Sequence, residues 1–337
     1  LRFGAVAQSA RVFINNTLLC EHKGGFLPFE AEINEVVHSG ENRLTVAVDN
    51  RVNFSTLPVG SEKGGNMLTG LIPDVPGVTP KKQNYPNFDF FNYSGITRPV
   101  TLYTTPRDYI RDITLVPSVN GTNAEVQYKI DTVGSGTVQL TVRDESGTIV
   151  ANAEGAEGSF TIENVHRWEP LAAYLYSAEV HFGSDTYTEP FGVRTVCVRG
   201  KEFLINGKPF YFKGFGKHED APFRGRGLDN VVNVKDISLM RWIGANSFRT
   251  SHYPYAEEMM YLCDREGIVV IDETPAVGVN MNFGATAGGA PQDTYQILHT
   301  KEHHEEVIRD MIERDKNHAC VVMWSIANES DTTTFPD

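Results

Sequence analysis

The sequence predicts a multidomain protein in which two β-rich parts precede an α/β part, and three observations lead to this fold class. At 337 residues the chain is long enough for two or three domains, since a typical domain has about 150 residues. Before Cys197, short β-type runs stand between clusters of Gly, Pro and Asn. After Cys197, strand-like and helix-like segments alternate, as they do in α/β folds.

Composition narrows the class of protein. Lys and Arg number 30 against 43 Asp and Glu, and a net charge of −13 argues against nucleic-acid and membrane-surface binding. The sequence contains no apolar run of the ~20 residues that cross a bilayer. Its four cysteines form no C-x-x-C pair, which favours reduced thiols and a cytoplasmic protein. Because the chain opens at Leu1 within a β-type run, we expect residues upstream, with room there for an export signal.

Residues 1–105 form the first part. The runs at residues 11–14 and 43–48 are rich in β-branched and aromatic side chains and predict an antiparallel sheet. A Pro-rich stretch around residues 71–77 predicts a long irregular loop, and loops of that length are usually functional or disordered.

Residues 106–197 form the second part. Apolar and polar residues alternate cleanly in the runs 124–130 and 138–142, with turn signals about every ten residues. This pattern predicts a small β-sandwich.

Residues 198–337 form the third part, for which we expect four parallel strands joined by helices. The strands are predicted at residues 210–214, 246–250, 268–272 and 321–326. One helix is expected around residues 234–243. The second carries Tyr255, Met259, Leu262 and Cys263 on one face and ends at Gly267, and the third carries Ile308, Met311 and Ile312 on one face. Right-handed crossovers then give a parallel arrangement of the kind found in (β/α) barrels.

Each predicted strand of the third part ends in polar residues. These clusters are residues 217–220, 249–253, 272–274 and 328–330. The carboxyl ends of barrel strands form the reaction face, and gathering so many ionisable groups there is costly unless it serves function. The sequence therefore predicts an active site at this rim.

The fourth cluster is the most informative, because an apolar strand ends directly in Asn328 and Glu329. Retaining glycoside hydrolysis needs one carboxylic acid to protonate the leaving oxygen and a second carboxylate, ~5 Å away, to attack the anomeric carbon. Glu329 suits the first role. The alternative is a glutamate that caps the next helix.

Four stretches carry a close resemblance to a known family. They are FKGFGKHED at 212–220, WIGANSFRTSHYPYAEE at 242–258, RDKNH at 314–318 and VMWSIANE at 322–329. In these stretches the chain resembles the β-glucuronidases of the glycoside hydrolase family that also holds β-galactosidases and β-mannosidases. The resemblance implies a jelly-roll sugar-binding domain at 1–105, an immunoglobulin-like sandwich at 106–197, and the N-terminal half of a catalytic (β/α)8 barrel at 198–337.

The resemblance also implies roles for five residues. Glu329 would be the general acid/base, and Asn328 would hold the sugar 2-hydroxyl. His218 and Asp89 would contact the sugar from the barrel and from a jelly-roll loop, although Asp89 also reads as a turn aspartate. Arg249 would keep the nucleophile ionised, as a nearby opposite charge does.

The resemblance further implies the ligands and partners. The substrates would be β-glucuronide conjugates, and the protein would assemble as a homo-oligomer, a dimer or tetramer, without nucleic acid or membrane. No cofactor or metal is expected, because Val277 stands where the β-galactosidase branch has a magnesium carboxylate. His299, His303 and His304 lack the His-Glu-x-x-His order and predict a solvated helix face.

Two departures from the family pattern matter. Ser330 replaces the usual Pro after the catalytic Glu, which removes no reacting group. The nucleophilic Glu of the seventh strand and the Asn and Lys that read the sugar carboxylate have no match in this chain. We therefore expect a piece of a longer enzyme that is inactive alone.

Other readings stay open at this level. Within the enzyme class the rivals are β-galactosidase, β-mannosidase and β-galacturonidase, and outside it a non-catalytic carbohydrate-binding protein. The Gly-rich segment 284–290 is either a lid beside the aglycone pocket or a disordered connector.

Overall fold

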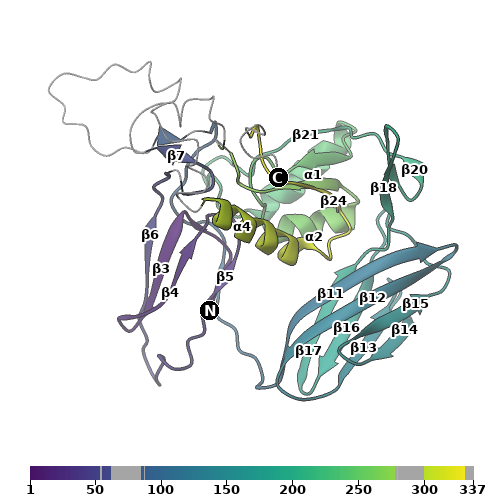
Figure 1. The fold of residues 1–337 in the computed structure, drawn as a ribbon, viewed down its shortest axis with the longest axis horizontal. Coiled ribbons are helices and arrows are strands. Elements are labelled where there is room, and N and C mark those ends of the chain that lie inside the picture. The colour runs from purple at the N-terminus through teal and green to yellow at the C-terminus, as the bar shows by residue number, and fades with distance from the viewer. Residues whose placement is uncertain (54, 62–84, 87, 278, 280–299, 331–337) are drawn as a thin grey trace.

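The computed structural model describes residues 1–337 except 54, 62–84, 87, 278, 280–299 and 331–337. Three parts follow one another along the chain, a first β-rich part in purple, a β-sandwich in teal and an α/β part in green to yellow (Figure 1). The expected fold class is confirmed. The Pro-rich stretch around 71–77, the segment 284–290 and His299 lie outside the described residues.

The first part is a set of small antiparallel sheets, as expected for a jelly roll. Strands β4, β3 and β6 form one three-stranded sheet, in which Arg11 pairs with Ala47, and β10, β1 and β5 form another. The turn between β3 and β4 uses Asn15 and Asn16, whose φ angles of 50° and 69° suit a tight hairpin. The strands are β1 (Arg2–Phe3), β2 (Val6–Ala7), β3 (Ser9–Ile14), β4 (Thr17–Lys23), β5 (Phe29–Glu30), β6 (Leu44–Asp49), β7 (Gly60–Ser61), β8 (Tyr85–Pro86), β9 (Gly95–Ile96) and β10 (Val100–Thr101).

The second part is a sandwich of two antiparallel sheets, β11-β12-β15 and β14-β13-β16-β17. Strand β12 alternates buried and exposed residues, so Val126 and Tyr128 enter the core beside Leu140 and Val180. The strands are β11 (Tyr109–Asn120), β12 (Asn123–Val133), β13 (Val138–Arg143), β14 (Ile149–Glu154), β15 (Glu157–Ile162), β16 (Tyr176–Phe182) and β17 (Asp185–Phe191).

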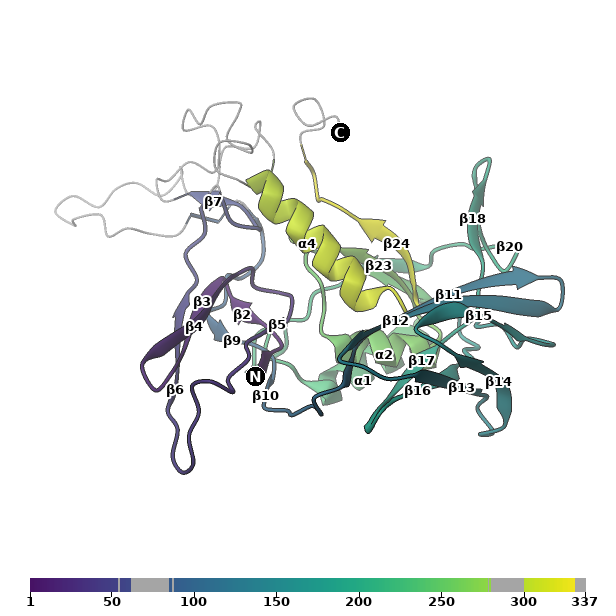
Figure 2. The ribbon, with the colours of Figure 1, turned by 60° about the horizontal axis from the view of Figure 1, so that its bottom comes forward.

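The third part has a parallel sheet in the order β21-β22-β23-β24, and Figure 2 shows helices α1, α2 and α4 beside β23 and β24. It begins with a three-stranded antiparallel unit, β18-β19-β20. The elements are β18 (Val196–Arg199), β19 (Glu202–Ile205), β20 (Lys208–Pro209), β21 (Gly214–Gly216), α1 (Asn230–Trp242), β22 (Ser247–Arg249), α2 (Glu257–Glu266), β23 (Val269–Glu273), α4 (Thr300–Asp315) and β24 (Val321–Ser325). Within the described residues, no helix is both long and apolar enough to span a bilayer.

Local signals explain where α1 and α2 begin and end. Asp229 caps α1, because its carboxylate accepts from the backbone N–H groups of Val231 and Val232. Gly267 ends α2 in the left-handed conformation with a φ of 68°. A Cβ there would lie 2.5 Å from the backbone nitrogen of Leu171 in the sandwich. Glycine is therefore required both by the turn and by the close approach of the two parts.

Two expectations about the third part are wrong in detail. The first barrel strand is not residues 210–214 but β21, because the Phe210 N–H bonds back to the Phe203 carbonyl and closes the preceding hairpin. On α4, Ile312 is exposed while His303 and His304 are buried, so the predicted solvated face is wrong. The cause is that α4 lies between the parallel sheet and the jelly roll, and both views show it covered on two sides (Figures 1 and 2).

Buried polar contacts join the other parts to the barrel. Arg98 of the jelly roll donates to the carbonyls of Phe26 and Pro254 and pairs with Glu219, whose side chain is 8% exposed. On the sandwich side, Asn317 accepts from the Leu115 N–H at 3.0 Å and donates to the Ile113 carbonyl at 2.8 Å. The three parts are thus held at fixed positions by groups that would be costly to leave unpaired.

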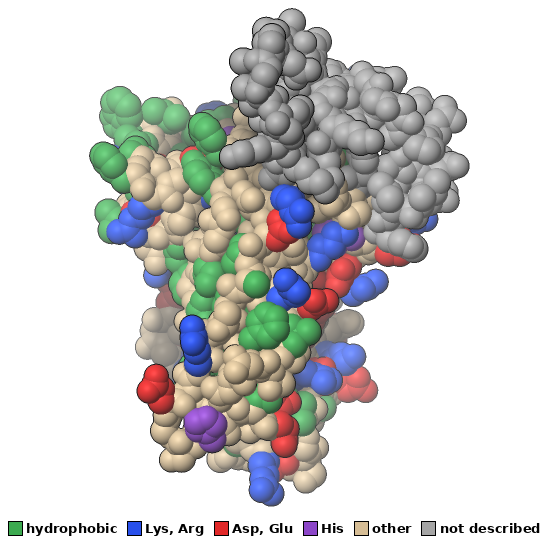
Figure 3. Space-filling model, turned by 90° about the vertical axis from the view of Figure 1, so that its left-hand side faces the viewer, with side chains coloured by type: hydrophobic (Ala, Val, Ile, Leu, Met, Phe, Trp, Pro, Cys, Tyr) green, Lys and Arg blue, Asp and Glu red, His purple; other side chains and the backbone are tan. Residues whose placement is uncertain are grey.

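The jelly-roll side of the surface carries both signs of charge. Lys and Arg side chains lie among Asp and Glu side chains over the described part of this face (Figure 3). Over the described part of this face, neither sign of charge gathers into a large area of its own (Figure 3).

Candidate active site

The carboxyl ends of the four parallel strands meet at one edge of the sheet. Gly216 pairs with Arg249, Arg249 with Ile271, and Ile271 with Met323. The polar residues that follow these positions therefore lie along a single rim. The structure brings together His218, Arg249, Asn328 and Glu329 from the expected set, and a jelly-roll loop adds Asp89.

Glu273 is the buried centre of this rim. Its side chain is 0% exposed, and each of its two carboxylate oxygens has a hydrogen-bond or ion-pair partner. Oε1 lies 2.7 Å from Nδ1 of His252, and Oε2 lies 2.9 Å from Nη1 of Arg249 and accepts from the Ser325 hydroxyl at 2.7 Å. Three donors compensate the burial of one carboxylate and fix the orientation of the guanidinium and the imidazole.

Arg249 connects this centre to the fourth strand end. Its Nη1 also donates to Oδ1 of Asn328 at 3.5 Å. The Asn328 backbone N–H bonds to the Ala276 carbonyl at 3.1 Å, and the residue forms a parallel bridge with Val277. With its amide oxygen turned to Arg249, Asn328 has an NH₂ group with which to donate to a ligand.

Glu329 lies on a loop that the side chains of Thr274 and His304 contact. The Ile326 carbonyl accepts from the Thr274 hydroxyl at 2.5 Å and lies 2.6 Å from Nε2 of His304. Glu329 itself is exposed and has a φ of 52°, a conformation that is unfavourable for a residue other than Gly. Such backbone strain concentrates at functional sites, where the surrounding structure imposes it.

The jelly roll reaches the rim through the loop that carries Asp89. The Phe90 ring lies 5.7 Å from the His218 ring and 5.3 Å from the Tyr253 ring, centroid to centroid. Burial and the nearby His252 lower the pKa of His218, so its imidazole is neutral at neutral pH. The negative charge of Asp89 opposes this lowering of the His218 pKa to a smaller extent, so Asp89 lies within electrostatic reach of the ring. Two parts of the chain therefore share one rim.

Sequence reasoning missed the roles of Glu273, His252 and Phe90. Glu273 and His252 lie in the predicted strand-end clusters, but nothing in the pattern tells which member of a cluster is buried. For Phe90 the signal was available, since aromatic residues flank Asp89 on both sides.

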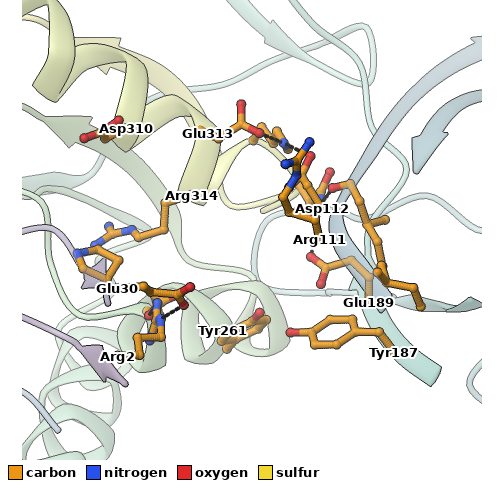
Figure 4. A pocket seen from close by; sticks show the side chains of 16 residues that line it. Arg2, Glu30, Arg111, Asp112, Tyr187, Glu189, Tyr261, Asp310, Glu313 and Arg314 are labelled. Atoms are coloured by element: carbon orange, nitrogen blue, oxygen red, sulfur yellow. Dashed lines mark hydrogen bonds and ion pairs between the residues drawn. The ribbon is translucent and has the colours of Figure 1, made fainter. Parts of the chain in front are cut away.

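A cavity away from the rim is not part of the candidate site. It has a volume of about 420 Å³ and lies where the three parts meet (Figure 4). Its charges are largely paired internally, with Arg2 on Glu257 at 2.6 Å and Lys316 on Asp112 at 2.6 Å. This cavity lies at the interface between the three parts and does not extend the rim.

The rim offers an exposed carboxyl, an amide, imidazoles and a guanidinium. This set suits a polyhydroxylated ligand, whose hydroxyls need several donors and acceptors, together with proton transfer by the carboxyl. Among the described residues, no three His, Cys, Asp or Glu side chains converge as a ready metal site.

Three family models match successive parts of the chain. They are the sugar binding domain of glycosyl hydrolases family 2 at residues 1–106, a second domain of glycosyl hydrolases family 2 at 108–194, and the TIM barrel domain of that family at 196–335.

Curated relatives resemble the chain over its full extent. A β-glucuronidase of Felis catus is 47% identical over 98% of this chain and 51% of its own length, and one of Paenibacillus borealis is 46% identical over 100% and 56%. The chain spans about half the length of the curated relatives it matches.

Solved structures of β-glucuronidases also resemble the chain. The β-glucuronidase of Faecalibacterium prausnitzii is 51% identical, with a TM-score of 0.89 over 99% of this chain and 56% of that one. That of Bifidobacterium dentium, complexed with coumarin-3-O-glucuronide, is 48% identical, with a TM-score of 0.89 over 98% and 56%.

Proposed function

This chain belongs to glycosyl hydrolase family 2, and we propose that the whole protein is a retaining exo-glycosidase that hydrolyses β-D-glucuronides to glucuronate and an alcohol. The likeness to β-glucuronidases over the full chain supports glucuronides above the galactoside, mannoside and galacturonide alternatives. The B. dentium complex supports aryl conjugates as one class of substrate.

One observation carries the chemical part of the proposal. Arg249 joins the buried carboxylate of Glu273 to the amide of Asn328, next to the exposed Glu329. Glu329 then protonates the departing glycosidic oxygen and later takes a proton from the attacking water. Asn328 donates to the sugar 2-hydroxyl, while His218 and Asp89 bind further hydroxyls.

The attacking carboxylate has to come from outside the described residues. Glu273 is the carboxyl bound at the centre of the rim, and its burial and two occupied oxygens prevent it from reaching an anomeric carbon. A retaining mechanism needs a carboxylate ~5 Å from the acid, free to form the glycosyl-enzyme bond.

The substrate class is tested with the whole protein and a panel of 4-nitrophenyl glycosides. We expect turnover of the β-glucuronide, with the β-anomer of glucuronate as first product by NMR. Preferential turnover of the β-galactoside or β-galacturonide, or an α-anomer as first product, would contradict the proposal.

The 337-residue chain by itself should not turn over 4-nitrophenyl β-glucuronide, because the described rim supplies an acid without a free second carboxylate. The measurement is nitrophenol release by the purified chain, with the whole protein as the positive control. Steady release that persists on further purification would show that these residues suffice.

We further propose that the whole protein is a cytoplasmic homodimer or homotetramer. All four cysteines are unpaired, which supports a reducing compartment. Trp242 and Tyr211 are 82% and 78% exposed, and such large apolar side chains support burial against a further surface. Light scattering that gives a monomer at every concentration would refute the assembly, and a cleaved export signal on the purified protein would refute the compartment.

A further inference from the structure

A half-buried histidine and a buried one lie close together where the jelly roll meets α4. His22 lies on β4 and His303 on the first turn of α4. His303 is 5% exposed, and among the described residues neither of its ring nitrogens has a hydrogen-bond partner; Nε2 of His22 is also buried and has none there. Buried polar atoms without partners are rare in proteins, and binding of an ion or a water is a common reason for them.

The two rings border the same small space. A Cβ on Gly24 would lie 3.6 Å from Cε1 of His303 and 3.7 Å from Nε2 of His22. A cavity of about 10 Å³ adjoins it, lined by residues that include His22, Gly24, Glu306 and Asp310. That volume is close to the space occupied by a single water molecule or ion.

The chemistry of the donors favours a cation. His22 is hydrogen-bonded through its other nitrogen to the Gly24 backbone, an arrangement that fixes the tautomer of many metal-binding histidines and leaves Nε2 as a free electron-pair donor. Burial lowers the pKa of both His22 and His303 to about 4, so both are neutral, which is the form that binds metals.

Helix α4 supplies carboxylates on the same face. His303, Glu306 and Asp310 are spaced i, i+3 and i+7, so they lie on one side of the helix. Oε2 of Glu306 is 3.6 Å from Nδ1 of His303, and the Glu306 side chain is 61% exposed and free to change rotamer.

We propose that His22, His303 and Glu306 form a binding site for a borderline divalent cation, with Zn²⁺ as the representative. Nitrogen and carboxylate donors in this ratio suit Zn²⁺, with water or Asp310 as the fourth ligand. Because no three such side chains already converge among the described residues, binding requires Glu306 to turn inwards. Lys23 also borders the cavity and opposes the site through its charge.

The site would couple the two parts of the chain that form the rim. His303 faces β4 of the jelly roll, while the next residue, His304, contacts the Ile326 carbonyl just before Asn328 and Glu329. A cation held between β4 and α4 would therefore fix the helix that supports the Glu329 loop.

The test is Zn²⁺ titration of the tag-free, chelator-treated whole protein by calorimetry, with Co²⁺ absorption as a second readout. We expect one Zn²⁺ per chain, a higher Tm with Zn²⁺, and the strong visible bands of tetrahedral Co²⁺. Glu306→Gln, an exposed position with little risk to folding, should weaken binding by more than about tenfold, since even the loss of an outer-shell partner costs 10–100-fold. His303→Leu should abolish binding, and Lys23→Met should tighten it.

The control is His38→Leu, which removes an exposed histidine of the same domain and should leave binding unchanged. His303→Leu should also be at least as stable as the parent protein without metal, because it removes two orphaned nitrogens. Absence of Zn²⁺ binding by the parent protein, or equal binding by the parent protein and Glu306→Gln, would overturn the proposal and leave a buried water as the occupant.

Discussion

In the whole protein, Glu329→Gln should reduce hydrolysis of methyl β-glucuronide by about 10²–10⁴-fold while reducing that of a 4-nitrophenyl or other activated aryl β-glucuronide much less. An alkoxide is a poor leaving group and must be protonated as it departs, whereas a nitrophenolate leaves without help. Glutamine keeps the size and the hydrogen bonding of the side chain but cannot deliver the proton.

The measurement is kcat/KM for a series of glucuronides whose leaving groups differ in pKa. The variant should show a steep dependence on that pKa and the parent a shallow one. Glu305→Gln, an exposed glutamate on α4, is the matched control and should leave both slopes unchanged. Parallel slopes in the parent and Glu329→Gln would remove Glu329 from the acid role.

Glu273→Gln should destabilise the protein by about 3–5 kcal/mol, the usual cost of breaking a buried ion pair from one side. The substitution leaves the Arg249 guanidinium without its carboxylate and places an amide NH₂ group among groups that are themselves donors. It should also lower kcat for activated and poor leaving groups alike, because Arg249 and Asn328 lose their alignment without any change in the proton donor.

Urea unfolding at constant pH measures the first effect, and the leaving-group series measures the second. Glu266→Gln is the matched control, because it breaks the surface pair with Arg241 and should cost no more than about 1 kcal/mol. A Glu273→Gln variant as stable as Glu266→Gln would mean that the carboxylate is not the centre of the rim. A selective loss on poor leaving groups would give Glu273 part of the acid's role.

Much of the fold could be predicted because its signals are local. Strand β23 begins with the apolar run Val269 to Ile271, and α2 combines an apolar face with a terminal glycine, so each can be recognised from a few adjacent residues. The candidate site was accessible for a related reason. Parallel strands bring their carboxyl ends together, so polar residues after each strand predict a shared rim without any knowledge of distances.

The errors have a different origin. Helix periodicity registers apolar residues, and on α4 it selected Ile312, whereas packing against two surfaces buried His303 and His304 instead. The burial of Glu273 depends on which of its neighbours donate to it, and those neighbours come from β22, the turn that follows it, and β24. Arg249 and Ser325 lie 24 and 52 residues from Glu273 in the sequence, and the residues next to each partner do not indicate that these contacts form.

The buried pair of Arg98 and Glu219 has a consequence for recombining domains between relatives. One member comes from the jelly roll and the other from the barrel, and each also bonds to main-chain groups at positions 26, 254 and 256. A chimaera that imported one of the two without the other would enclose a lone charge at the junction. Grafted jelly rolls should therefore be chosen with an arginine at position 98 wherever the recipient keeps its glutamate.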